Sequence, residues 1–86
     1  MTTLEMLAAH FGGLPIIPLE SASPFWGYKE STLVEKIDAG EIRLPYFRLD
    51  EKQKAMRLAK LEDIAAIIDE RHEAARTELM ELWDAK

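Results

Sequence analysis

Few side chains in this sequence could carry out covalent or metal chemistry. There is no cysteine, and the two histidines, His10 and His72, are far apart. Asp69 and His72 stand three residues apart, which is half of a helical metal-binding pattern, but that pattern needs a second such pair on a facing helix. The serines have no glycine-framed turn, and Gly12–Gly13 form no phosphate-binding loop. We therefore expect no enzyme activity, no metal, no cofactor and no small-molecule substrate.

Positive charge is concentrated in one short segment of an acidic chain. The 86 residues carry a net charge of −5, yet residues 43–60 hold six lysines and arginines against two acids, a net charge of +4. Residues 61–86 hold eight acids against three basic residues. A strip of cations can displace counterions from double-stranded DNA, although it could also be a solvated edge that prevents sheets from aggregating.

The elements that must position these cations begin with three short helices. Apolar spacing predicts a first helix that starts near Thr2 or Thr3 and ends at Gly12–Gly13. Residues 14–18 contain two prolines and should be an extended connector or an edge strand. A second short helix follows, which Pro24 should shorten, and a third is predicted over 30–39, with Thr32 and Glu35 in capping-box spacing.

A small β-hairpin and a long helix should complete the fold. Residues 42–49 and 56–59 are rich in β-type side chains, and the polar segment between them is the predicted hairpin tip. The final helix should begin at about Leu61 and run to the C-terminus, with apolar residues at 3-4 spacing interrupted by His72. About 25 residues at roughly 1.5 Å each span nearly 40 Å, which is longer than so small a domain can cover.

We therefore expect the second half of this helix to contact another chain. A domain of this size without disulfides is often stabilised by a partner subunit, so we expect a homodimer. The alternative is that residues 75–83 fold back over the core. The candidate dimerisation residues are Ile68, His72, Ala75, Leu79, Leu82 and Trp83.

This order of elements is typical of a winged helix-turn-helix. We expect a mainly α-helical protein with a small β-hairpin, in which residues 1–60 form the DNA-binding domain and residues 61–86 form a helix that closes the core and mediates dimerisation. In such a domain the third helix enters the major groove and the hairpin lies on phosphates or in the minor groove. The candidate DNA-binding residues are Tyr28, Lys29, Ser31, Thr32, Glu35 and Lys36 on the helix, and Arg48, Lys52, Gln53, Lys54 and Arg57 on the hairpin.

Four sequence blocks carry a family resemblance. They are I-P-L-E at 17–20, F-W-G at 25–27, A-G-E-I-R-L-P at 39–45 and L-E-D-I-A-A-I-I-D-E-R at 61–71. In combination they resemble the pyocin activator (PrtN-type) family of small prophage- and bacteriocin-associated transcription regulators, over about two-thirds of the chain or more. The resemblance implies activation of a bacteriocin or phage operon through DNA binding.

Two other functions compete with this hypothesis. The layout is also similar to excisionase and MerR-like domains, so the protein could be a recombination directionality factor that binds direct repeats and bends DNA. Alternatively, the acidic C-terminal helix could mimic DNA or contact RNA polymerase, as in an anti-regulator. We expect a cytoplasmic protein, because the absence of cysteine fits a reducing compartment and no apolar run is long enough to cross a membrane. The first ten residues carry Glu5 and no lysine or arginine, which argues against a signal peptide.

Overall fold

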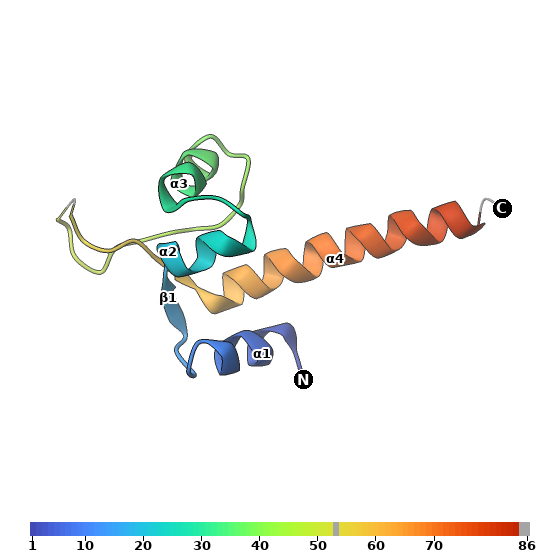
Figure 1. Cartoon of the computed structure of the whole chain (residues 1–86), viewed down its shortest axis with the longest axis horizontal. Coiled ribbons are helices and arrows are strands. Elements are labelled where there is room, and N and C mark those ends of the chain that lie inside the picture. Colours follow the sequence, from blue (N-terminus) through green and yellow to red (C-terminus); the bar gives the residue numbers. More distant parts are fainter. Residues whose placement is uncertain (53, 85–86) are drawn as a thin grey trace.

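Figure 1 shows a small helical body from which one long helix projects. The computed structural model describes residues 1–52 and 54–84. Helix α1 (Thr3–His10) begins as predicted, because the Thr2 hydroxyl accepts a hydrogen bond from the Glu5 amide at 3.1 Å. It lies along the first half of the last helix, α4 (Leu61–Asp84), where the Thr3 hydroxyl donates to the Asp69 carboxylate at 2.5 Å.

A two-stranded antiparallel sheet joins two segments that lie far apart in the chain. Strand β1 (Ile16–Pro18) pairs with β2 (Leu58–Lys60), with Ile17 opposite Ala59. Both of these central residues are buried. Of the two alternatives predicted for residues 14–18, the edge strand is the one that forms, at 16–18, and its partner lies some 40 residues further along the chain.

The second helix is short, as Pro24 predicted. Helix α2 (Leu19–Ala22) gives way to a 3-10 turn, η1 (Ser23–Phe25), because proline lacks the amide donor that would continue an α-helix. Gly27 then turns the chain with φ of +74°, in the left-handed region that glycine adopts without steric cost.

Helix α3 (Glu30–Asp38) agrees with the predicted range, but its start differs from the predicted cap. Lys29 occupies the N-cap position with no side-chain hydrogen bond. Thr32 and Glu35 lie inside the helix, so they do not form the expected capping box. Leu33 is completely buried in the core, and Gly40, with φ of +79°, ends the helix.

The expected hairpin forms at only one point. Phe47 and Leu58 make a single antiparallel bridge, with backbone hydrogen bonds of 3.0 and 2.8 Å. Pro45 limits pairing of the first arm, and Leu44 is buried in the core instead of extending a strand. The second arm pairs with β1 along three residues and meets the first arm only at this bridge, so residues 41–57 form a long loop that is closed at its base (Figure 1).

Helix α4 divides into a buried half and a projecting half. Leu61, Ile64 and Ala65 face the core, whereas every residue from Asp69 to Asp84 is exposed. The helix does not fold back over the body, so the molecule measures 56 × 31 × 17 Å. Within residues 1–52 and 54–84, no helix has both the length and the apolar composition that a membrane crossing requires. The buried core consists of Leu7, Ile17, Leu19, Ala22, Leu33, Leu44, Ala59, Leu61, Ile64 and Ala65.

Candidate nucleic-acid interface

Three predicted DNA-binding cations lie exposed on the long loop. Arg48 donates from Nε to the Ala55 carbonyl at 3.3 Å, which braces the two sides of the loop against each other. Lys52 and Lys54 stand near the tip, and neither makes an ion pair with another described residue. Gln53, the remaining predicted contact at the tip, lies outside the described residues. The exposed loop therefore presents positive charge to solvent.

Arg57 occupies a different environment from these three cations. Its Nη1 lies 3.3 Å from Oε1 of Glu30 at the start of α3, and each of the two side chains is 33% exposed. Its Nε atom is buried without a hydrogen-bond partner among the described residues. Arg57 is thus partly buried at the base of the loop, and its charge is balanced by Glu30.

A second contact joins the loop to the other end of α3. The Tyr46 hydroxyl donates to Asp38 at 2.9 Å. This hydrogen bond, together with partial burial and the nearby Asp38 charge, raises the pKa of Tyr46 above its ordinary value. The loop is therefore held at both ends of the helix, at Glu30 and at Asp38, and the two elements form one unit.

The exposed face of α3 is polar rather than basic. Ser31 and Glu35 are exposed one turn apart, and Thr32 beside them is half-buried. Lys29 is exposed immediately before the helix. The loop supplies the positive charge that this face lacks.

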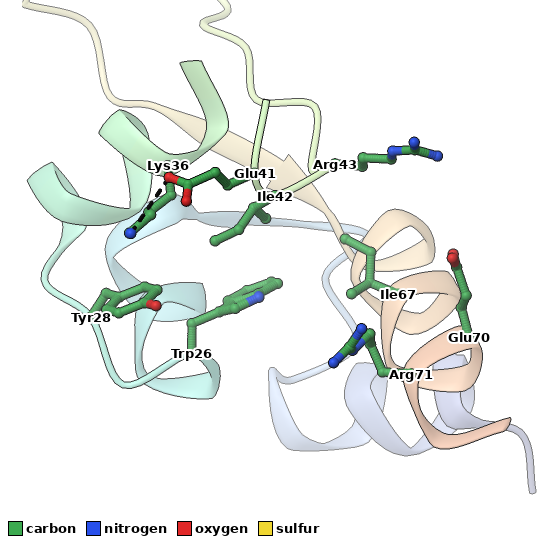
Figure 2. Close-up of a pocket in the computed structure, with 9 residues that line it drawn as sticks. All are labelled: Trp26, Tyr28, Lys36, Glu41, Ile42, Arg43, Ile67, Glu70 and Arg71. Atoms are coloured by element: carbon green, nitrogen blue, oxygen red, sulfur yellow. Dashed lines mark ion pairs between the residues drawn. The ribbon is translucent and has the colours of Figure 1, made fainter. Parts of the chain in front are cut away.

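Tyr28 and Lys36, the remaining helix candidates, lie against each other. The Lys36 Nζ atom is 5.9 Å from the centre of the Tyr28 ring and 3.5 Å from Oε2 of Glu41. They line a cleft of about 500 Å³. Figure 2 shows this cleft between the α3 region and α4. From α4, Arg71 reaches into this cleft toward Trp26, whereas Arg43 points away from it.

A second hollow, of about 530 Å³, lies between the loop and the start of α3. Its lining combines the acids Glu20 and Glu30 with Lys54 and Arg57. This lining includes the ion pair of Arg57 and Glu30 that closes the loop against the helix.

Sequence reasoning named Arg57 as a candidate but missed the contacts that position this surface. Glu30 and Arg57 are 27 residues apart, and no local pattern signals that they meet. Asp38 and Tyr46 are eight residues apart across a glycine turn. No local sequence pattern predicts a hydrogen bond between residues at this spacing, so only the folded chain reveals the contact.

The dimerisation candidates lie on α4. Ile68 is half-buried at the edge of the core, and His72 and Ala75 follow it on the exposed part of the helix. Leu79, Leu82 and Trp83 are 55%, 65% and 71% exposed. Within the part of the chain that the structure describes, no three histidine or acidic side chains come together as a metal site would require.

The fold and this surface define a small, mainly helical protein with a two-stranded antiparallel sheet, a long C-terminal helix and a cationic loop tied to α3. A family model described as pyocin activator protein PrtN matches residues 3–75. The chain belongs to this family of regulatory activator proteins, and this membership supports its assignment as a transcriptional activator of pyocin genes. Neither the curated proteins nor the solved structures include a significant match.

Proposed function

We propose that this protein activates pyocin genes by binding double-stranded DNA with α3 and the loop of residues 41–57. The observation that carries the proposal is the pairing of a loop that presents Arg48, Lys52 and Lys54 with a helix whose exposed face is polar. A role in transcription also implies that the protein acts in the cytoplasm.

In this proposal the loop and the helix have different roles. The loop cations contact phosphates, which provides affinity without sequence preference. The hydroxyls of Ser31 and Thr32 and the carboxylate of Glu35 read base edges, where a carboxylate can accept a hydrogen bond from the amino group of cytosine. Lys29 holds a phosphate beside the start of the helix.

The overall acidity of the chain does not oppose this binding mode. The exposed half of α4 carries six acids against two arginines, and it projects from the side of the body opposite the loop (Figure 1). The molecule is 56 Å long, whereas charges in solution are screened over about 8 Å at physiological ionic strength. The acidic helix is therefore too distant to repel phosphates that contact the loop.

The acidic helix also supports a second candidate function. Its exposed carboxylates could contact RNA polymerase or another protein, either in addition to DNA binding or in place of it. In the second case the loop lysines would have no role in activity.

A mobility-shift experiment separates these functions. We would titrate the protein against DNA fragments from the neighbourhood of its own gene, at about 50 to 200 mM salt, and compare it with the double variant Lys52→Met/Lys54→Met. The control is Lys60→Met, because Lys60 is paired with Glu62 at 2.9 Å, a contact that raises its pKa.

The proposal predicts that the wild-type protein and the Lys60→Met control bind an upstream fragment tightly and that the double variant does not. Absence of binding by the folded wild-type protein at low salt would overturn it. If binding occurs, the footprint distinguishes an activator at paired inverted half-sites from an excisionase-like factor at direct repeats.

A further inference from the structure

The core-facing stripe of α4 continues beyond the body of the protein. Leu61 and Ala65 are buried and Ile68 is half-buried. The same alternation of four and three residues then leads to four further positions, all of them exposed: His72, Ala75, Leu79 and Leu82. A seven-residue repeat of this kind forms the contact line of a coiled coil. These four residues are called the exposed stripe below.

The charges on the projecting helix are sorted around the exposed stripe. The charged residues at its two edges are Asp69, Arg71, Arg76 and Glu78, whose charges cancel. The other four acids of the segment lie on the remaining helix surface: Glu70, Glu73, Glu81 and Asp84. A basic partner would be attracted to that acidic surface, whereas the neutral edges of the stripe suit a second copy of the same helix.

We propose that two copies of this chain pair through the exposed stripe with their α4 helices antiparallel. In this register His72 lies opposite Leu82 of the partner, and Ala75 lies opposite Leu79 of the partner. Arg71 then stands beside Glu78 of the partner, and the two-fold axis repeats this attraction. Arg71 lines the cleft beside Trp26 but makes no ion pair with another described residue, so it can turn to this contact without breaking one.

Parallel pairing is opposed by both charge and shape. It would place Arg71 beside Arg76 of the partner, twice per dimer. These are the e and g positions, where coiled-coil helices form interhelical salt bridges, and two arginines there repel each other. It would also bring the two bodies together at one end. Antiparallel overlap of residues 70–84 ends where the body begins, so it covers the exposed part of the helix without reaching the core.

The pairing does not rest on DNA binding, and it is tested on the full chain without DNA. Sedimentation equilibrium should show a dimer for the wild type and a monomer for Leu79→Glu. Leu79 is exposed in the monomer, so this change should leave the helical circular dichroism of the body intact. Glu81→Gln, on the outer surface, is the matched control and should remain dimeric. A wild type that stays monomeric at hundreds of micromolar would overturn the proposal.

Charge reversal tests the orientation. Arg71→Glu and Glu78→Arg should each weaken the dimer about tenfold at low salt, because each places like charges together at two symmetric contacts. The double variant should regain the wild-type dissociation constant. If the helices were parallel, Arg71→Glu would face Arg76 of the partner and would strengthen the dimer instead of weakening it. Strengthening would overturn the antiparallel arrangement.

Disulfide formation supplies an independent readout, because the chain has no cysteine of its own. In the antiparallel register, Ala75→Cys mixed with Leu79→Cys should form a mixed disulfide. Leu82→Cys alone should not cross-link, because position 82 lies about 15 Å along the axis from position 82 of the partner. Rapid cross-linking of Leu82→Cys would contradict the proposal.

Discussion

Replacing Arg57 and replacing Lys54 should have different effects on DNA binding, although both residues are basic and close in sequence. The Lys54 ammonium is exposed and makes no ion pair with a described residue, whereas the Arg57 guanidinium lies 3.3 Å from the Glu30 carboxylate. A cation that is already neutralised by a carboxylate of the protein displaces no counterion from DNA. Arg57 therefore positions the loop instead of contributing to the salt dependence of binding.

The size of the difference follows from the number of phosphate contacts. Each contact contributes about −0.9 to the slope of log K against log salt, so a rise from 50 to 200 mM weakens binding about 3.5-fold per contact. The three loop cations and Lys29 together give about 150-fold for each bound chain. Lys54→Met should reduce this loss to about 40-fold, and Arg57→Met should leave it near 150-fold.

The assay is fluorescence anisotropy of a labelled duplex at four or more salt concentrations. Glu30→Gln is the reciprocal variant, because it removes the partner of Arg57 and should steepen the slope by about 0.9. The half-exposed ion pair stabilises the fold by at most about 1 kcal/mol, so both variants should remain folded. If Arg57→Met flattened the slope as much as Lys54→Met, Arg57 would leave Glu30 to bind phosphate and this reasoning would be refuted.

Three further predictions concern the same surface and its support. Tyr46→Phe should lower the free energy of unfolding by about 0.5 kcal/mol at neutral pH, because it removes the hydrogen bond to Asp38. The pKa of Tyr46 is raised in the folded state, so the stability that its hydroxyl contributes is fully present below pH 10 and is lost as pH rises through the folded-state pKa. Urea unfolding should therefore show the difference in stability between wild type and Tyr46→Phe shrinking at alkaline pH. Leu33→Ala should cost about 3 kcal/mol in the same unfolding measurement, because the side chain is completely buried, and a cost below about 1 kcal/mol would argue against this core. Glu35→Ala should reduce the preference for the specific site over unrelated DNA by about tenfold while leaving the salt slope unchanged, and a loss of equal size on every sequence would contradict a role in base reading.

Local sequence signals predicted the helices well. The Thr2 cap, the spacing of apolar residues in α3 and the start of α4 at Leu61 act within a few residues, so their effects are visible in sequence. The same holds for Pro24, which shortens α2 through its own missing amide. The family blocks, confirmed by the match over residues 3–75, depend on sequence alone.

Long-range contacts could not be predicted in this way. Strand β2 pairs with β1 on one side and meets Phe47 through Leu58 on the other, and no local pattern predicts that its longer pairing is with a segment some 40 residues away. The ion pair between Glu30 and Arg57 likewise forms only when the sheet brings the end of the loop to the start of α3. The predicted DNA contacts and dimer contacts remain predictions, although the exposure of residues 69–84 removes the alternative in which that segment folds back.

The most direct test of the central claim is a map of the surface that DNA touches. Amide chemical shifts of the labelled protein would be recorded with and without a short duplex at low salt. The account predicts shift changes in residues 28–36 and in the loop between residues 48 and 57, with α4 beyond residue 76 unaffected. Changes confined to the projecting half of α4, or no changes at all, would contradict DNA binding through the loop and the third helix.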